Sequence, residues 1–254
     1  DNINGMDFTP ESRVPDPERL TQAYSQSAAT LNLLRAFSQG GYANLSNVHR
    51  WMLGFVDRSP QGERYEQLAD QISKSLDFMK ACGVTPDSVP QMSQVEFYTS
   101  HEALLLGYEE AMTRIDSTSG EWYDTSAHML WIGHRTRQID HAHVNFCKGI
   151  RNPIGIKCGP GLETDELLRM IETLNPNDEP GRITLISRFG SEGVAKALPP
   201  LARAVKKSGR TVVWSCDPMH GNTLKTDSGF KTRPVDRILS EVRQFVDVLS
   251  SEGC

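Results

Sequence analysis

Residues 152–160 read NPIGIKCGP, a short apolar run that stops at a turn containing glycine and proline. Within this segment, residues 154–157 favour a buried β-strand. Four further runs of the same kind lie at residues 95–99, 129–132, 183–187 and 211–215. Helix-like stretches follow the five runs in turn, at residues 102–114, 139–150, 164–174, 193–207 and 234–251. Because parallel strands need a crossover connection, these strand–helix units predict an α/β fold with a parallel sheet.

The first ninety residues follow a different, helical pattern. Asp16-Pro17 supplies a helix start, and apolar residues keep helical spacing from there to Phe37, before Gly40-Gly41. Further helices are predicted at residues 45–55 and 63–82, the latter ending at Gly83. No strand is expected before residue 93. Pro199-Pro200, inside the fourth helix of the second part, predicts a kink or two short helices.

Composition narrows the possible partners. The 254 residues contain 27 basic and 32 acidic side chains, a net charge of −5, which disfavours nucleic acid as a partner. No apolar run approaches the length of a membrane span, so no membrane association is expected. The five cysteines are odd in number and lack CxxC pairs, and no secretory signal is present. These features predict a cytoplasmic protein.

The predicted strand ends carry a set of cations. Arg135, Lys157 and Arg188 each follow or end a different strand, and the carboxyl ends of parallel strands meet at one edge of a sheet. Arginine and lysine in such a cluster suit a phosphate or carboxylate ligand. His220, flanked by Asp217 and Asn222, follows the fifth strand. Its pattern fits either a metal ligand or a hydrogen-bonded histidine.

Taken together, these segments resemble the class II (plant-type) 3-deoxy-D-arabino-heptulosonate 7-phosphate (DAHP) synthases. The matching strings are residues 1–5 (DNING), 27–37 (SAATLNLLRAF), 99–106 (TSHEALLL), 131–138 (WIGHRTRQ), 152–160 (NPIGIKCGP), 183–190 (ITLISRFG), 216–223 (CDPMHGNT) and 229–233 (GFKTR). The resemblance runs from end to end, and strings of this length in this order are highly specific.

The resemblance implies a TIM (β/α)₈ barrel with a helical segment inserted between its second and third strands. Residues 1–92 would be that segment, and residues 93–254 would supply five βα units, strands 3 to 7 of the family barrel. Both parts would form a single domain overall. We therefore expect a partial barrel, an internal piece of a longer chain truncated at both ends.

The activity implied is that of a transferase, 3-deoxy-7-phosphoheptulonate synthase. It condenses phosphoenolpyruvate with D-erythrose 4-phosphate and water, giving DAHP and phosphate. This reaction is the first step of the shikimate pathway, which leads to chorismate and the aromatic amino acids. The resemblance also implies a divalent metal, Mn²⁺ or Co²⁺, and a homo-oligomeric parent protein.

Site residues carry over at matching positions. Arg135, Lys157 and Arg188 fall where the family binds the phosphate and carboxylate of phosphoenolpyruvate, and Trp131 and the backbone around His134 line the same pocket. Position 134 is often acidic in the family, whereas a histidine there would add positive charge below about pH 6.5.

Glu102 matches an acidic residue near the reacting centre and would assist the attacking water, and His220 matches the metal-binding histidine. The catalytic set implied is therefore Lys157, Arg188, Glu102 and His220.

Three of the four family metal ligands are absent from this chain: a cysteine expected upstream, and a glutamate and an aspartate expected downstream. We therefore expect residues 1–254 alone to show no synthase activity, even with manganese. Two alternatives stay open. One is a different phosphoenolpyruvate-condensing or metal-dependent aldolase on the same barrel. The other is a non-catalytic chain that binds an anion or is completed by a partner subunit.

Overall fold

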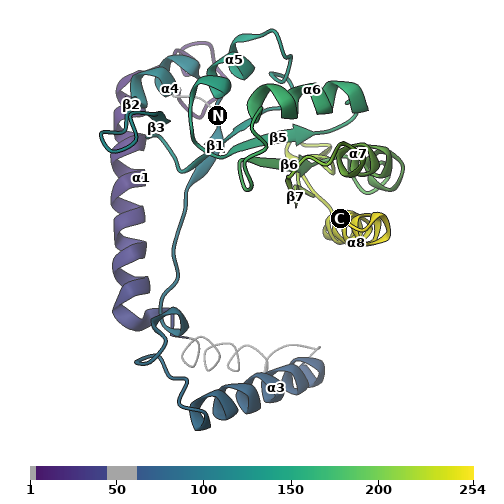
Figure 1. Ribbon diagram of the computed structural model, residues 1–254. Coiled ribbons are helices and arrows are strands. Elements are labelled where there is room, and N and C mark those ends of the chain that lie inside the picture. Colours follow the sequence, from purple (N-terminus) through teal and green to yellow (C-terminus); the bar gives the residue numbers. More distant parts are fainter. Residues whose placement is uncertain (1–3, 45–61) are drawn as a thin grey trace. The chain divides into compact units, whose positions relative to one another are not determined.

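A computed structural model describes residues 4–44 and 62–254, and the chain divides into two compact units, Asp1–Phe97 and Tyr98–Cys254. The first unit contains helix α1 (Glu18–Phe37), a short π-helical turn (Ser38–Tyr42), helix α3 (Gly62–Ala81) and a 3₁₀ turn (Pro90–Met92). Figure 1 shows the elements in chain order. As predicted, the described part of this unit contains no strand.

The helix boundaries in the first unit follow local chemistry. Asp16 Oδ1 accepts the backbone N–H of Glu18 at 3.1 Å, next to the predicted proline start of α1. Gly41 and Gly83 adopt φ values of 90° and 79°, which only glycine adopts easily, and helical structure ends near both. The predicted helix at residues 45–55 lies outside the described residues.

The second unit is built on a five-stranded sheet in the order β1-β4-β5-β6-β7, with every neighbouring pair parallel. The strands are β1 (Ser100–Glu102), β4 (Met129–Ile132), β5 (Ile154–Cys158), β6 (Ile183–Ser187) and β7 (Val213–Cys216). The helices that connect or follow them are α4 (Leu106–Met112), α5 (Ala142–Gly149), α6 (Thr164–Leu174), α7 (Val194–Ser208) and α8 (Val235–Glu252). The predicted α/β fold with a parallel sheet is confirmed.

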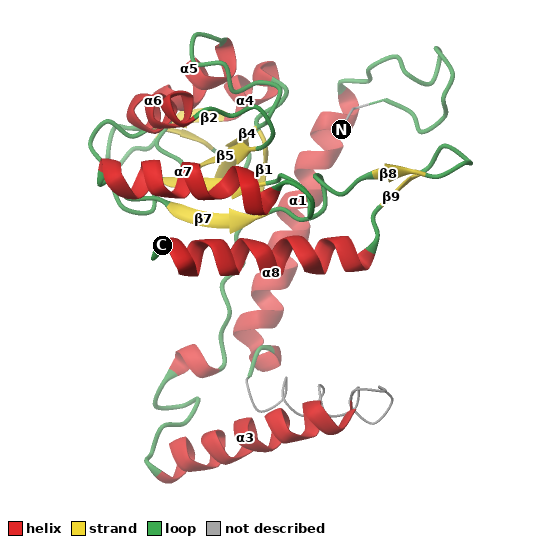
Figure 2. Cartoon of the chain, turned by 90° about the vertical axis from the view of Figure 1, so that its right-hand side faces the viewer, coloured by secondary structure: helices red, strands yellow, loops and turns green. Residues whose placement is uncertain are grey.

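Strand register separates the two faces of the sheet. Leu130, Ile154 and Ile183 lie side by side on one face and are fully buried, as are their neighbours two residues further along each strand. This face packs against α5, α6, α7 and α8 to form the hydrophobic core (Figure 2). The opposite face carries Trp131, Lys157 and other partly exposed residues.

Two predictions about elements need correction, and two hairpins were not predicted. The first strand is Ser100–Glu102 and not residues 95–99, which lie outside any strand and expose Val95 and Tyr98. The helix predicted at residues 102–114 is the shorter α4. It is followed by an antiparallel hairpin that periodicity did not reveal, formed by β2 (Thr113–Ile115) and β3 (Trp122–Asp124). A second small hairpin pairs β8 (Leu224–Lys225) with β9 (Lys231–Thr232).

Pro199 and Pro200 lie inside one helix, α7, which is not divided into two short helices. A proline in a helix interior costs about 3 kcal/mol. The apolar side of α7 is buried in the core through Val194, Leu198 and Val205, and this burial offsets that cost. In the described residues, no helix is both long and apolar enough to cross a membrane.

Candidate active site

The predicted site residues gather at the carboxyl edge of the parallel sheet. Glu102 is the last residue of β1, and Lys157 is the penultimate residue of β5. Arg188 directly follows β6, and His220 lies four residues beyond β7. Ligands of parallel α/β folds bind at this edge because the loops that leave the strands converge there.

Lys157 and Trp131 share the face of the sheet opposite the hydrophobic core. Trp131 is in register with Gly155, and Lys157 is two residues further along β5, so both side chains emerge on the same side. The Lys157 ammonium lies 5.3 Å from the centroid of the Trp131 ring, within the range of a cation–π interaction. The tryptophan therefore forms a wall against which the charged lysine rests.

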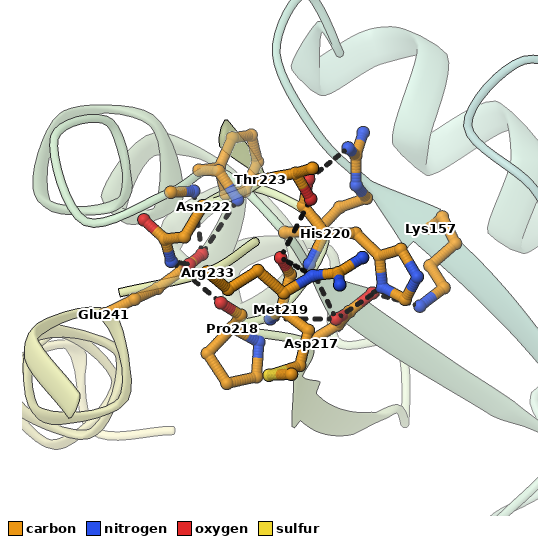
Figure 3. Close-up of polar contacts among 12 residues, drawn as sticks. Lys157, Asp217, Pro218, Met219, His220, Asn222, Thr223, Arg233 and Glu241 are labelled. Carbon is orange, nitrogen blue, oxygen red and sulfur yellow. Dashed lines mark hydrogen bonds and ion pairs between the residues drawn. The ribbon is translucent and has the colours of Figure 1, made fainter. Parts of the chain in front are cut away.

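Asp217 connects Lys157 to His220. Its Oδ2 atom accepts a hydrogen bond from Lys157 Nζ at 2.5 Å and lies 2.7 Å from His220 Nδ1 (Figure 3). Burial would raise the pKa of Asp217, but the hydrogen bonds and charges of Lys157 and His220 outweigh it and lower the pKa to about 2. The carboxylate is therefore ionised, and it orients both side chains.

Arg188 joins the same group from the next loop. Its Nη2 atom donates to the backbone carbonyl of His220 at 3.2 Å. Gly159 lies between Arg188 and His134: a Cβ at this position would be 3.1 Å from Arg188 Nη1 and 3.1 Å from His134 Nδ1. Glycine at position 159 thus lets the side chains of Arg188 and His134 approach the loop that follows β5.

His134 does not carry the extra positive charge that its ordinary pKa suggests. Arg137 Nη1 lies 3.1 Å from His134 Nδ1, so the arginine donates to a ring nitrogen that must be unprotonated. Burial, followed by the charges of Arg137 and Arg188, lowers the pKa of His134 below its usual value. Both effects favour the neutral imidazole, and Arg137 is a buried supporting residue that also pairs with Glu166.

Glu102 and Arg135 occupy different surroundings. The Glu102 carboxylate packs against Gly133, where an added Cβ would meet Oε1 at 2.0 Å, so it lies beside the backbone that leads to His134. Arg135 is exposed, and its guanidinium makes no hydrogen bond or ion pair with the described residues. The structure therefore connects Glu102 to this edge of the sheet and leaves the Arg135 guanidinium exposed.

Glu241 and Asn222 lie against this edge of the sheet, and Glu241 is not among the residues expected at a strand end. Glu241 is fully buried on α8, and its carboxylate accepts hydrogen bonds from Asn222 and from the backbone after β6. A sequence signal exists: Glu241 lies three residues after Ile238 and four before Phe245, on the apolar side of the helix. A carboxylate on a buried helix face requires polar partners.

A metal could use one donor of this site. His220 Nδ1 is engaged by Asp217, which leaves Nε2 without a hydrogen-bond partner among the described residues. Metal-binding histidines commonly have one ring nitrogen oriented by a carboxylate in this way. Within residues 4–44 and 62–254, no group of three or more histidine, cysteine, aspartate or glutamate side chains is arranged to hold an ion.

The whole chain, residues 1–254, matches the family described as "Class-II DAHP synthetase family". The chain belongs to the class-II DAHP synthetase family.

Two curated relatives agree with this membership. The chain is 54% identical over 253 residues to the phospho-2-dehydro-3-deoxyheptonate aldolase of Streptomyces coelicolor, covering 100% of this chain and 56% of that protein. It is 47% identical over 258 residues to the phospho-2-dehydro-3-deoxyheptonate aldolase AroG of Mycolicibacterium smegmatis, covering 100% of this chain and 55% of that protein. This class-II DAHP synthetase chain thus spans about half the length of the curated relatives it matches.

Proposed function

We propose that the protein containing this chain is a 3-deoxy-7-phosphoheptulonate synthase, a transferase. It would condense phosphoenolpyruvate with D-erythrose 4-phosphate and water, giving DAHP and phosphate, as the first step of the shikimate pathway. The observation that carries the proposal is the linked group Lys157–Asp217–His220–Arg188 at the carboxyl edge of the sheet in a class-II DAHP synthetase chain.

Phosphoenolpyruvate carries a phosphate and a carboxylate, and three cations of the chain suit them. Arg188 offers a planar fork for bidentate binding, and the exposed Arg135 is not committed to an ion pair with the described residues. Lys157 supplies a point charge held in place by Asp217 and Trp131. A neutral His134 beside Arg188 adds a polar wall without a further charge.

In the proposed reaction, C3 of phosphoenolpyruvate bonds to the aldehyde carbon of erythrose 4-phosphate, and positive charge develops at C2. Water adds at C2 and gives a hemiketal phosphate, while the former aldehyde oxygen takes up a proton and becomes a hydroxyl. The C2–O bond to phosphate then breaks as the C2 carbonyl forms, and inorganic phosphate leaves. Lys157 and Arg188 would stabilise the negative charge of the departing phosphate through groups already in place. Glu102 would orient the attacking water and accept its proton.

A divalent metal, Mn²⁺ or Co²⁺, fits the free Nε2 atom of His220 as one donor. When bound, such an ion would polarise the aldehyde carbonyl as a Lewis acid. Asp217 would then position two side chains: it keeps the His220 ring in one orientation and holds the Lys157 ammonium in place by a hydrogen bond.

We further propose that the parallel sheet is part of a TIM barrel, with residues 93–254 supplying five βα units and residues 1–92 a helical segment inserted before the third strand. A sheet of parallel strands with helices on one face supports this proposal. The protein would act in the cytoplasm, consistent with five cysteines that are all free, and would assemble as a homo-oligomer.

Alanine substitution of Lys157 and Arg188 tests the function in the complete natural protein that contains this chain. We expect K157A and R188A each to lower kcat/KM for phosphoenolpyruvate by about 100-fold or more, because each removes a charge aimed at the substrate anion. Lys207 and Arg243 are exposed on α7 and α8 and have no hydrogen bond to a site residue in the part of the chain that the structure describes, so K207A and R243A serve as matched controls. Near-normal turnover in both site variants, measured by phosphate release, would refute the assignment.

A further inference from the structure

Glu241 binds the backbone that carries Arg188. From the middle of α8, its Oε1 atom accepts the N–H groups of Phe189 at 3.0 Å and Gly190 at 2.9 Å. These are the two residues that directly follow Arg188. A buried carboxylate that accepts two backbone donors holds that short segment in one conformation.

The other oxygen of the same carboxylate binds the loop that carries His220. Glu241 Oε2 accepts Asn222 Nδ2 at 2.6 Å (Figure 3). Asn222 in turn donates to the Pro218 carbonyl at 2.8 Å and accepts the Ser191 N–H at 3.0 Å. The loops after β6 and β7 are therefore joined through one glutamate and one asparagine.

Two glycines allow these loops to touch. A Cβ on Gly190 would lie 2.8 Å from the Gly221 carbonyl oxygen, and a Cβ on Gly221 would lie 2.4 Å from the Gly190 nitrogen. Arg188 also donates to the His220 carbonyl across the same junction. The relative position of Arg188 and His220 is thus determined at this contact and not by the strands alone.

We propose that Glu241 is a positioning residue for the synthase reaction: it holds the Arg188 segment and the His220 loop at a fixed separation without touching substrate. This inference rests on the proposed function for its catalytic consequence. Its structural basis, the hydrogen bonds from one buried carboxylate to both loops, is independent of what the protein binds.

The E241Q variant tests the contact of residue 241 with the His220 loop separately from its contact with the Arg188 segment. The amide oxygen of glutamine can still accept from Phe189 and Gly190, but its NH₂ group would face the NH₂ group of Asn222. Asn222 cannot turn its amide over without losing its bonds to Pro218 and Ser191. The substitution therefore weakens the His220 loop selectively. D247N is the matched control, because Asp247 is an exposed carboxylate on the same helix.

Hydrogen exchange provides the readout that does not depend on activity. In the complete natural protein, we expect the amides of Ser191, Met219 and His220 to exchange about tenfold faster in E241Q than in D247N. A change of this size is expected when one hydrogen bond to a charged group is lost. Amides within β5 should not change. Unchanged exchange at all three loop amides would overturn the proposal.

Kinetics then tests the catalytic consequence. We expect E241Q to lower kcat about tenfold and to raise the Mn²⁺ concentration for half-maximal activity, while KM for phosphoenolpyruvate stays within about threefold, because the Arg188 segment keeps its acceptor. A variant that loses only thermal stability, with kcat equal to D247N, would show a merely structural role and overturn the proposal.

The two proposals can fail separately. If the wild-type protein does not condense phosphoenolpyruvate with erythrose 4-phosphate, the proposed function is wrong. The exchange measurement still decides the link, since faster exchange in both loops supports it and unchanged exchange refutes it.

Discussion

Asp217 has a central position among the individual residues, because one carboxylate contacts both Lys157 and His220. The side chains of Asp217 and Lys157 are only 10% and 14% exposed, so water screens their attraction poorly. Removing one partner of a buried pair leaves the other charge without compensation, which costs more than the pair itself contributes.

Substitution of Asp217 by asparagine should therefore reduce both stability and turnover. We expect D217N to lower the free energy of unfolding by about 3 kcal/mol and kcat by about tenfold or more, because Lys157 loses its counter-ion and His220 its orienting acceptor. Thermal denaturation and steady-state kinetics of the complete natural protein measure these effects. D247N, the same change on the exposed surface of α8, should change neither, and equal behaviour of the two variants would contradict the role given to Asp217.

A second cluster of titratable side chains, His101, Glu109 and Asp124, lies in the second unit on the side of the sheet that the helices cover. Glu109 and Asp124 are each 1% exposed; Glu109 lies 2.7 Å from His101 Nε2 and accepts the Ser126 hydroxyl. Burial, followed by the neighbouring Glu109, raises the pKa of Asp124 to about 6, and the hydrogen bond to Glu109 raises the pKa of His101. Burial would raise the pKa of Glu109, but its hydrogen bonds to His101 and Ser126 outweigh it and lower the pKa.

This cluster predicts a pH-dependent stability. A folded pKa of about 6 lies above the unfolded value of about 3.9, so the contribution of Asp124 is complete below pH 4 and is lost as the pH rises through 6. We expect D124N, which resembles the protonated form and can donate to Glu109, to raise the melting temperature at pH 7.5 by about 2–5 °C. At pH 4 the two proteins should melt together. A constant difference across this range would contradict the prediction.

At the scale of elements, the loops after β6 and β7 determine the positions of the site residues more than the strands do. The strands supply the edge, but Arg188, Asp217 and His220 all lie beyond the last paired residue. The loops can meet only because Gly190 and Gly221 carry no Cβ, and Gly190 also adopts a φ of 80°.

Alanine at Gly190 should therefore be much more harmful than alanine at another glycine of similar φ. Gly209, which ends α7 with a φ of 72°, has nothing within 4 Å of an added Cβ. We expect G209A to cost about 1 kcal/mol for the left-handed backbone. G190A should cost about 3 kcal/mol or more, because the new methyl group would meet the Gly221 carbonyl. Equal losses in thermal denaturation would show that the loops do not touch.

At the scale of the whole second unit, the sheet has one covered face and two outer strands. Core residues from α5 to α8 cover one face, while Trp131, Lys157 and Val213 lie on the other. In the described part of the chain, β1 and β7 form the outer edges of the sheet. Outer strands present unpaired backbone groups that can pair with another chain.

The 254-residue chain, purified alone, should consequently self-associate. We expect sedimentation velocity to show species larger than 28 kDa whose proportion rises with protein concentration, because open strand edges and exposed apolar side chains favour association. A single monomeric species at all concentrations would contradict this expectation.

The sequence alone determined the alternation of strands and helices in the second unit. The runs at 129–132 and 183–187 and the helix at 164–174 match β4, β6 and α6 at both ends, because local periodicity and turn residues specify such elements. It also placed Lys157, Arg188 and His220 at one edge, since parallel strands have a common direction. The prediction of the first strand at residues 95–99 was wrong, because pairing with β4, and not apolar composition, selects Ser100–Glu102.

Only the tertiary structure decided which groups interact. The pairing of Asp217 with Lys157 spans 60 residues, and the bond from Glu241 to Gly190 spans 51, so no local pattern could reveal either. The lowered pKa of His134 likewise depends on burial and on the charges of Arg137 and Arg188. Hydrogen bonds and electrostatic interactions depend on distance in space and on exclusion of water, and both arise only when the sheet and helices have packed.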